Sequence, residues 1–378
     1  MIVADVIVIG GGIAGAGAAY ELAADAKVLL LERESQCGYH ATGRSAASFT
    51  ENYGTATIRK LAGASRAFFE GPPDGFSEHP LVRPRGMVTI ARADQAEALD
   101  LELERARKFV ASIVRIGPEE AIRLVPALRR SYLADAIFEP DSRDIDVHGL
   151  HQGFLKGLRK LGGRIETDCE VGRMRRDKSG WSVETKGERY AAPIVVNAAG
   201  AWADEIAVTA GLRPLGLVAK RRCAFVIDAP QGLAIDAWPL VNDVGQSFYF
   251  KPDAGRLLVS PADAEPSPPT DAQPDEEEVA LGVDRFQRAT SIPVRRILRK
   301  WAGLRTFATD GGPVVGEDPE ARGFFWLGGQ GGYGIKTAPI LSRIVAALAR
   351  GKGLPPEAFA RGLTEAELSP ARFAPANA

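Results

Sequence analysis

The first 32 residues constrain the fold most, because an apolar run, a glycine turn, a helix pattern and a second apolar run follow one another without a gap. The β-branched run 5–9 is predicted as a strand and residues 10–15 as a tight turn. An amphipathic helix is predicted over 13–24, and a second strand over 27–31 that ends at Glu32. This order is the βαβ unit that holds a dinucleotide pyrophosphate. The sequence therefore predicts an α/β fold with a Rossmann-like domain.

The residues of this unit each have a physical role. Gly10 lets the strand turn tightly, Gly12 lets the backbone approach the pyrophosphate, and Gly15 lets the helix pack on the strands. Glu32 is placed to accept hydrogen bonds from a ribose 2′-hydroxyl, and an acid there disfavours the 2′-phosphate of NADP. A glycine turn that binds nothing is the alternative, and the second strand and the acid argue against it. The predicted contacts are Gly10, Gly12, Ile13, Ala14, Gly15, Glu32 and Arg33.

Composition and charge exclude several partners. The chain is long enough for two domains, and its formal net charge of -1 gives no reason to expect nucleic acid or an anionic membrane. Three cysteines without metal-ligand or C-x-x-C spacing indicate a reduced compartment. His148 and His151 lack a third ligand, so we expect surface or capping roles and no metal. With no leader and no bilayer-spanning apolar run, we expect a cytoplasmic protein without an integral membrane segment.

The segment 33–47 distinguishes this chain from an ordinary NAD domain, because it is rich in small residues and glycine where the next crossover is expected. It resembles the family of FAD-dependent D-amino acid oxidases and dehydrogenases, in which this segment lies along the flavin. The resemblance implies FAD as cofactor. Residues implied as FAD contacts here are Thr42, Arg44, Ser45 and Ala46. A surface loop with a helix cap at Ser45 is the alternative.

Two later segments return to the cofactor. A buried strand leads into the small-residue turn 197–202, and the glycine run 328–334 precedes a helix whose dipole can stabilise a reduced flavin. The alternative explanation is that the glycines in these two segments only let the chain turn as it leaves a strand. By resemblance, further FAD contacts are Glu170, Val171, Asn197, Ala198, Gly200, Trp202, Arg305, Gly331, Gly332, Tyr333, Gly334 and Ile335.

The resemblance spans nearly the whole chain and implies a two-part FAD-binding domain that an antiparallel-sheet substrate domain covers. The stretch 261–278, rich in proline and acids, is predicted as an exposed connector. Residues 1–80, 145–214 and 301–378 are assigned to the FAD-binding domain, and residues 81–144 and 215–300 to the substrate domain.

The resemblance also implies how a substrate is held between the two domains. Arg222 and Arg305 would bind its carboxylate, since the planar guanidinium matches a carboxylate bidentately. Tyr53 and Tyr249 would donate hydrogen bonds to it, and the main-chain oxygen of Gly332 would face the amine. Taken singly, a strand arginine usually meets solvent and a tyrosine usually fills core. Their joint match to the family favours the functional interpretation.

The side-chain pocket departs from the bacterial D-arginine dehydrogenases, which the chain resembles most within this family. Those enzymes have an acid near the start of a strand for the cationic side chain, where this chain has Gly86 and Met87. Glu51, in a predicted lid segment over 50–54, is an acid that a closing lid brings from another direction. The pocket positions are Ser48, Glu51, Met87, Leu240, Asn242 and Lys336.

The sequence therefore predicts oxidative deamination of D-amino acids with neutral or apolar side chains. Hydride passes from Cα to flavin N5, and the imino acid hydrolyses to a 2-oxo acid and ammonia. Oxidation of a 2-hydroxy acid or of an N-substituted or cyclic amino acid is the alternative, and a flavoprotein without turnover is the third possibility. The electron acceptor, whether a quinone, another carrier or oxygen, is left open.

Overall fold

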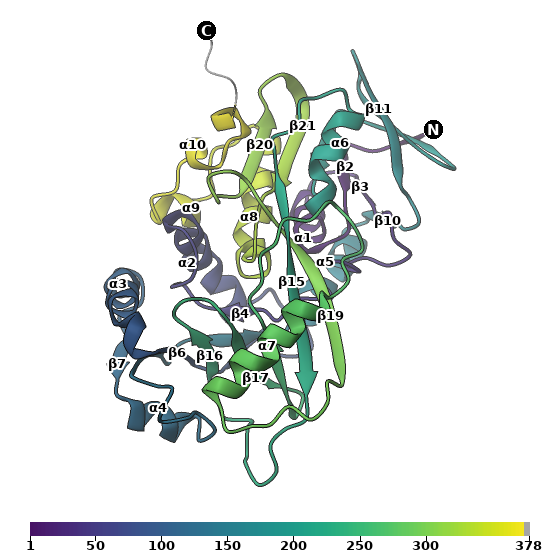
Figure 1. Ribbon diagram of the computed structural model, residues 1–378. Coiled ribbons are helices and arrows are strands. Elements are labelled where there is room, and N and C mark those ends of the chain that lie inside the picture. The colour runs from purple at the N-terminus through teal and green to yellow at the C-terminus, as the bar shows by residue number, and fades with distance from the viewer. Residues whose placement is uncertain (374–378) are drawn as a thin grey trace.

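The computed structural model of the protein describes residues 1–373. It contains two bodies that lie one above the other in Figure 1, one built on a six-stranded sheet and the other on an eight-stranded sheet. This is the two-part α/β architecture that the sequence predicts.

The six-stranded sheet has the order β10-β3-β2-β14-β21-β20. All neighbours are parallel except β20 and β21, which form an antiparallel pair at one edge. Its strands are β2 (Val6–Ile9), β3 (Val28–Leu31), β10 (Arg164–Glu166), β14 (Ile194–Asn197), β20 (Val314–Asp318) and β21 (Ala321–Gly328). The predicted βαβ unit is present as β2, α1 (Ile13–Leu22) and β3. The helix is buried on nearly every side, so the expectation of an amphipathic helix is wrong.

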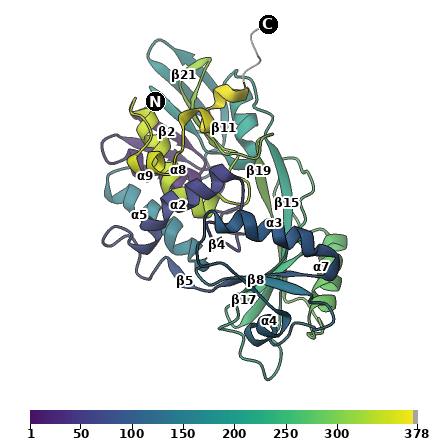
Figure 2. The same cartoon turned by 90° about the vertical axis from the view of Figure 1, so that its left-hand side faces the viewer.

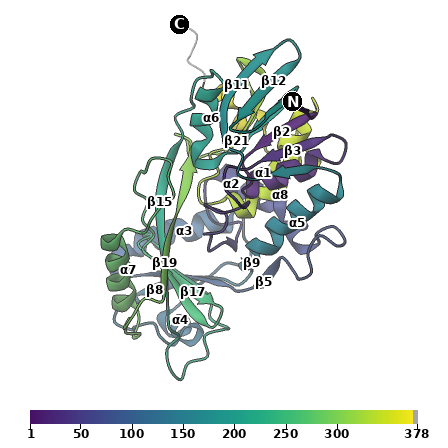
Figure 3. The ribbon, with the colours of Figure 1, turned by 90° about the vertical axis from the view of Figure 1, so that its right-hand side faces the viewer.

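Layers of different kinds cover the two faces of this sheet. On one face α1, α5 and α8 share a single apolar core with α2, and Figure 3 shows α1, α8 and α5 gathered below β2 and β3. On the other face lie α6 and a small sheet of order β1-β13-β12-β11. The helices are α2 (Ala56–Glu70), α5 (Val147–Lys160), α6 (Ala203–Thr209) and α8 (Gly334–Ala349), and the strands are β1 (Ile2–Val3), β11 (Val171–Asp177), β12 (Gly180–Thr185) and β13 (Arg189–Ala192).

The eight-stranded sheet has the order β19-β15-β18-β17-β16-β6-β8-β7. Its pairs are antiparallel except β16 and β6, which run parallel, so the expectation of a purely antiparallel sheet is wrong at this pair. The strands are β6 (Met87–Ala91), β7 (Val114–Ile116), β8 (Asp135–Glu139), β15 (Val218–Ile227), β16 (Leu240–Asp243), β17 (Tyr249–Asp253), β18 (Arg256–Ser260) and β19 (Arg299–Phe307).

Helices cover this sheet unequally. α4 (Pro118–Leu124) and α7 (Glu276–Ala289) belong to the apolar core of its outer face, which includes Phe225, Phe250 and Phe286. α3 (Ala96–Arg107) packs on the opposite face at β8 and crosses the lower body in Figure 2. The rest of that inner face turns toward the body that is built on the six-stranded sheet, which is called the nucleotide-binding body below, and residues of both line one cavity.

Short elements complete the described chain. β4, β9 and β5 form a three-stranded sheet, and short helices follow α8. The bounds are β4 (Ser48–Phe49), β5 (Val82–Pro84), β9 (Arg143–Ile145), α9 (Pro356–Ala360) and α10 (Glu365–Leu368), with 3-10 turns at Ala93–Gln95, Gly200–Trp202 and Pro370–Phe373.

One domain boundary and the exposure of one connector differ from the sequence expectations. β19 is paired with β15 along its whole length, so the eight-stranded sheet continues past residue 301, where the FAD-binding domain was expected to resume. The segment 261–278 was expected to be an exposed connector, and this is wrong for Asp263 and Ala272, which are buried. Asp263 is buried because its carboxylate accepts a hydrogen bond from the backbone of β15, whereas Ala272 belongs to the apolar core of the eight-stranded sheet.

The packing of α1 against α8 depends on a glycine. A Cβ atom at Gly17 would lie 2.1 Å from Oγ and 3.2 Å from Cβ of Ser342. The Ser342 hydroxyl is itself buried and has no hydrogen-bond partner among the described residues. The two helices therefore approach closely enough that one methyl group and one hydroxyl compete for the same space.

We expect Gly17→Ala to destabilise the protein by about 1–3 kcal/mol through overpacking, although alanine has the higher helix propensity. Ser342→Ala removes the colliding hydroxyl, so the double variant is expected to regain most of the loss. Denaturant midpoints at equal FAD saturation measure both effects. Additive behaviour, with no recovery in the double variant, would contradict this account of the contact.

Candidate active site

A cavity of about 340 Å³ lies between the two bodies. The nucleotide-binding body contributes the glycine turn, the segment 38–46, the turn after β14 and the glycine run before α8. The eight-stranded sheet contributes Arg222, Tyr249 and residues 303–306, and the connector contributes Thr270 and Ala272. The segments that the sequence assigns to a cofactor therefore meet around one space.

The glycine turn places backbone N–H donors at one end of the cavity. Gly12 caps α1 without a side-chain hydrogen bond, and Ile13 N–H donates to Thr42 Oγ1 at 2.9 Å. The N–H groups of Ala14 and Gly15 follow in the first helical turn, where no intrahelical acceptor exists. Backbone donors at the positive end of a helix suit a pyrophosphate.

The carboxylate of Glu32 lies against this turn. It accepts hydrogen bonds from Gly11 N–H at 2.6 Å and from Glu34 N–H at 2.9 Å. Each carboxylate oxygen has a further lone pair, so Glu32 remains able to accept from a ribose hydroxyl. Glu170 and Val171 line the cavity near it, as do Ala198, Gly200 and Trp202.

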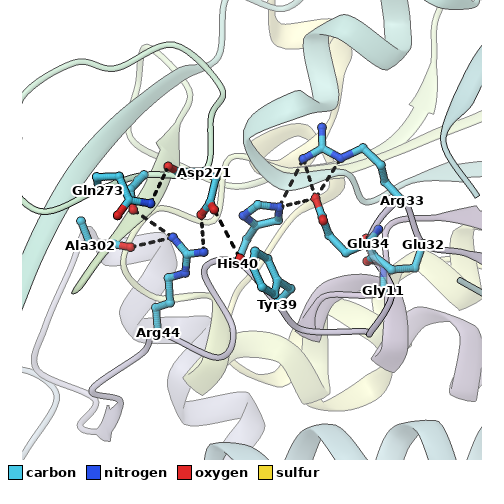
Figure 4. Close-up of polar contacts among 11 residues, drawn as sticks. Gly11, Glu32, Arg33, Glu34, Tyr39, His40, Arg44, Asp271, Gln273 and Ala302 are labelled. Atoms are coloured by element: carbon cyan, nitrogen blue, oxygen red, sulfur yellow. Dashed lines mark hydrogen bonds and ion pairs between the residues drawn. The ribbon is translucent and has the colours of Figure 1, made fainter. Parts of the chain in front are cut away.

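A polar network orders the segment after Glu32 (Figure 4). The carboxylate of Glu34 accepts from Arg33 Nη2 at 2.9 Å and contacts His40 Nε2 at 2.8 Å. The Arg33 guanidinium lies 4.2 Å from the ring centroid of Trp202, and the His40 ring lies 4.7 Å from the same ring. Arg33 and Trp202 are thus held beside the cavity by each other.

Arg44 joins this segment to the second body. Its guanidinium donates to the carbonyl oxygens of Ala272 and Ala302, each at 3.0 Å, and to the carboxylate of Asp271 at 2.5 Å. Tyr39 donates its hydroxyl to the same carboxylate at 3.3 Å. Arg44 lines the cavity, as do Thr42, Ser45 and Ala46, but its charged end faces the connector rather than the open space.

Three of the expected cofactor contacts, Gly15, Asn197 and Tyr333, do not line the cavity. Asn197 is fully buried, where its amide nitrogen donates to Ala203 O at 2.8 Å and its amide oxygen accepts from Ala199 N–H. Tyr333 packs on Tyr53, with ring centroids 5.1 Å apart. The remaining residues of the glycine run, namely Gly331, Gly332, Gly334 and Ile335, do line it.

His151 supports the glycine turn from behind, which the sequence analysis missed. Its ring is buried and Nε2 donates to Gly11 O at 2.9 Å, and burial lowers the pKa of the imidazole. The expected surface or capping role is therefore wrong for His151, whereas His148 is exposed. The apolar face of α5 carried a signal, since His151 lies between Leu150 and Phe154 on it.

We expect His151→Leu to weaken FAD binding about 5- to 150-fold, because it leaves the Gly11 carbonyl buried without its donor. His148→Leu on the same helix is the matched control and should leave binding unchanged. Titration of the apoprotein with FAD measures both. Equal affinities in the two variants would refute the supporting role of His151.

The strand register places three of the expected substrate residues, Arg222, Tyr249 and Arg305, on one face of the eight-stranded sheet. Arg222 is paired with Gly303, two residues from Arg305 on the next strand, and Tyr249 is paired with Asn242. Side chains alternate between faces, so these residues point away from the core beneath α7. Leu240 and Met87 are paired farther along the same face.

Arg222 and Arg305 form a partly buried cationic centre. Burial, and after it the charge of Arg305, lowers the pKa of Arg222, whereas Tyr249 and Tyr53 act in the opposite direction. Arg222 Nε donates to Asp263 O at 2.5 Å, and within the described residues Arg305 has no carboxylate at ion-pair distance. A Cβ atom at Gly332 would lie 2.8 Å from Arg305 Nη1, so the guanidinium lies directly against that backbone. The centre is suited to an anionic ligand.

The six expected side-chain pocket residues lie outside the cavity itself. Ser48 is paired with Asp144 in the small three-stranded sheet. Glu51 is buried, with its carboxylate bonded to Arg66 at 2.5 Å and to Arg361 at 3.4 Å. Lys336 is buried beneath Tyr53, and Met87, Leu240 and Asn242 are the strand residues described above.

Among the described residues, no group of three or more His, Cys, Asp or Glu residues is placed to hold a metal ion. No helix within residues 1–373 has the length and apolar character needed to cross a bilayer.

The model of the FAD dependent oxidoreductase family (DAO) matches residues 5–348. The chain belongs to this family. It is therefore an FAD-dependent oxidoreductase, and the helix end, the acid of β3 and the cationic centre described above suit the phosphates, the ribose and the substrate side of that cofactor.

Individual relatives extend over most of the chain. Glycine oxidase of Geobacillus kaustophilus is 27% identical over 362 residues, which cover 92% of this chain and 93% of the relative. Its crystal structure has a TM-score of 0.83 at 25% identity and covers 93% of this chain and 96% of the other. Mouse mitochondrial dimethylglycine dehydrogenase is 25% identical over 88% of this chain and 40% of its own length. L-proline dehydrogenase from P. horikoshii shares the fold, with a TM-score of 0.84 at 22% identity and 98% of each chain covered.

Proposed function

We propose that this enzyme oxidises D-amino acids with neutral or apolar side chains to imino acids, which hydrolyse to 2-oxo acids and ammonia. The observation that carries the proposal is the partly buried pair Arg222 and Arg305 at the cavity wall, with Tyr249 beside it. Relatives named for glycine, dimethylglycine and L-proline support a substrate with an α-carboxylate and an amine.

In this proposal the two guanidinium groups bind the substrate carboxylate, and the hydroxyl groups of Tyr53 and Tyr249 donate to it. The Gly332 carbonyl accepts from the amine. When bound, FAD would supply the acceptor for the hydride from Cα. In this arrangement the two arginines lie close to the substrate ammonium, and their positive charge favours the neutral amine. The ammonium can therefore lose its proton to water without a general base from the protein.

Oxidation of an N-substituted or cyclic amino acid is the second candidate. It is favoured by the names of two relatives, dimethylglycine dehydrogenase and L-proline dehydrogenase, and requires the same carboxylate contacts. Oxidation of a 2-hydroxy acid is the third candidate, because such a substrate has the same carboxylate and differs only in the absence of the amine. An anaerobic screen of flavin reduction by both enantiomers of amino acids, by N-methyl and cyclic amino acids and by hydroxy acids separates all three without reference to the electron acceptor.

Truncating either arginine tests the carboxylate contacts. Arg222→Ala or Arg305→Ala should lower kcat/KM about 10- to 150-fold, which corresponds to a lost charge-assisted hydrogen bond of about 1.5–3 kcal/mol. Arg221→Ala is the matched control, since Arg221 lies on the same strand but pairs with Asp275 at 2.9 Å. Wild-type efficiency in either active-site variant at full flavin content would refute the assignment.

The dependence of kcat/KM on the charge of the substrate side chain tests the proposed preference of the pocket for neutral side chains. Arg66 and Arg361 already compensate the Glu51 carboxylate, and Met87 and Leu240 extend the face on which Tyr249 lies. We therefore expect D-leucine and D-methionine to exceed D-arginine in kcat/KM by about 10- to 150-fold, the discrimination that a missing buried charge partner gives.

If D-arginine instead leads, the preference for neutral side chains is wrong, and Glu51→Gln then shows whether that acid is the reason. A fall in D-arginine efficiency with unchanged D-leucine efficiency would assign the preference to Glu51.

A further inference from the structure

The segment that carries Tyr53 has little regular structure of its own. It lies between the end of β4 at Phe49 and the start of α2 at Ala56. Tyr53 is nevertheless proposed above to donate a hydrogen bond to the substrate, which requires a fixed position. Contacts from outside the segment must supply that position.

A buried lysine supplies the first of these contacts. Lys336, in the first turn of α8, donates from Nζ to the carbonyl oxygens of Thr50 at 2.9 Å and of Tyr53 at 2.7 Å. Its ammonium also lies 5.5 Å from the ring centroids of Tyr53 and Tyr333. Within residues 1–373 no carboxylate is at ion-pair distance from it, and burial lowers the pKa of Lys336 to about 7.

A buried acid supplies the second contact from the other body. Thr50 Oγ1 donates to Glu139 Oε1 at 2.6 Å and accepts from Asn52 N–H at 2.9 Å. Glu139 is 3% exposed at the end of β8, and its other oxygen has no partner among the described residues. Burial raises the pKa of Glu139 to about 7.

These contacts converge on a stretch of four residues. An ammonium group and a carboxyl group are both costly to bury, and neither has its usual ion-pair partner here. What both of them bind is the segment 50–53, the lysine through main-chain oxygens and the acid through the Thr50 hydroxyl. The shared consequence is a fixed backbone beneath the Tyr53 ring.

We propose that Lys336 is a positioning residue that holds Tyr53 over the substrate carboxylate, and that Glu139 and Thr50 complete a clamp on the same segment. The proposal rests on the carboxylate role proposed for Tyr53. The clamp joins α8 of the nucleotide-binding body to β8 of the eight-stranded sheet, so it also fixes the segment relative to both walls of the site.

Hydrogen exchange in the holoenzyme tests the clamp directly. In Lys336→Met, which keeps the length of the side chain but removes its donors, the amides of residues 50–54 should exchange about tenfold faster while α1 and β2 are unchanged. Thr50→Val removes the hydroxyl without touching a buried charge, and should accelerate the same amides. Lys60→Met is the matched control, because Lys60 donates to Gly362 O at 2.8 Å and not to this segment.

A double-mutant cycle tests the positioning of Tyr53. Benzoate, a carboxylate that cannot reduce flavin, serves as the probe through its effect on the flavin spectrum. Tyr53→Phe and Lys336→Met should each weaken benzoate binding about tenfold. The double variant should bind no more weakly than either single variant, because both changes abolish the same hydrogen bond, which the Tyr53 hydroxyl donates to the carboxylate.

The outcomes separate the two proposals. Additive losses in the cycle, or unchanged exchange at residues 50–54 in Lys336→Met with full flavin content, would overturn the role of Lys336. If neither benzoate nor any amino acid perturbs the wild-type flavin, the proposed function fails, and the exchange measurement alone still decides whether the clamp exists.

Discussion

The cofactor-binding body depends on one close approach, between the end of β2 and the start of α1. A Cβ atom at Gly15 would lie 1.9 Å from Gly10 O, and Gly10 itself has a φ of +105° with Ala198 O 2.5 Å from where its Cβ would be. No other residue type fits these positions without moving a strand. Because the helix is seated so near the strand ends, its N–H groups, Glu32 and the turn after β14 all border one space.

This constraint explains why so much of the fold was predictable from the sequence. A glycine turn between an apolar run and an acid is compatible with few structures. Side chains alternate between the two faces along a strand, so Arg222, Arg305 and Tyr249 fall on one face of the sheet once their strands are recognised. The order of the strands was less accessible. The parallel pair of Leu240 with Met87 joins segments far apart in the chain, and neither strand carries a local mark of its neighbour.

The residues that the sequence did not reveal act through the main chain of distant segments. His151 binds a carbonyl 140 residues away, and Lys336 binds one 286 residues away. Asp263 orients Arg222 through its own carbonyl oxygen. A carbonyl group exists at every position and leaves no trace in residue identity, so such partners follow only from the folded structure. Lys336, which was expected at the side-chain pocket, lies outside the cavity and binds the main chain of Thr50 and Tyr53.

The contacts of Arg44 determine how the cofactor cavity is closed. The connector residues Thr270 and Ala272 border that cavity, and the Arg44–Asp271 pair that holds them is half open to solvent at the aspartate. Ion pairs of this kind contribute about 0–1 kcal/mol and weaken as salt rises, whereas the two carbonyl contacts of the same guanidinium are far less sensitive to salt. The closure of this cavity therefore has two components of different ionic-strength dependence, and both are made by the Arg44 side chain.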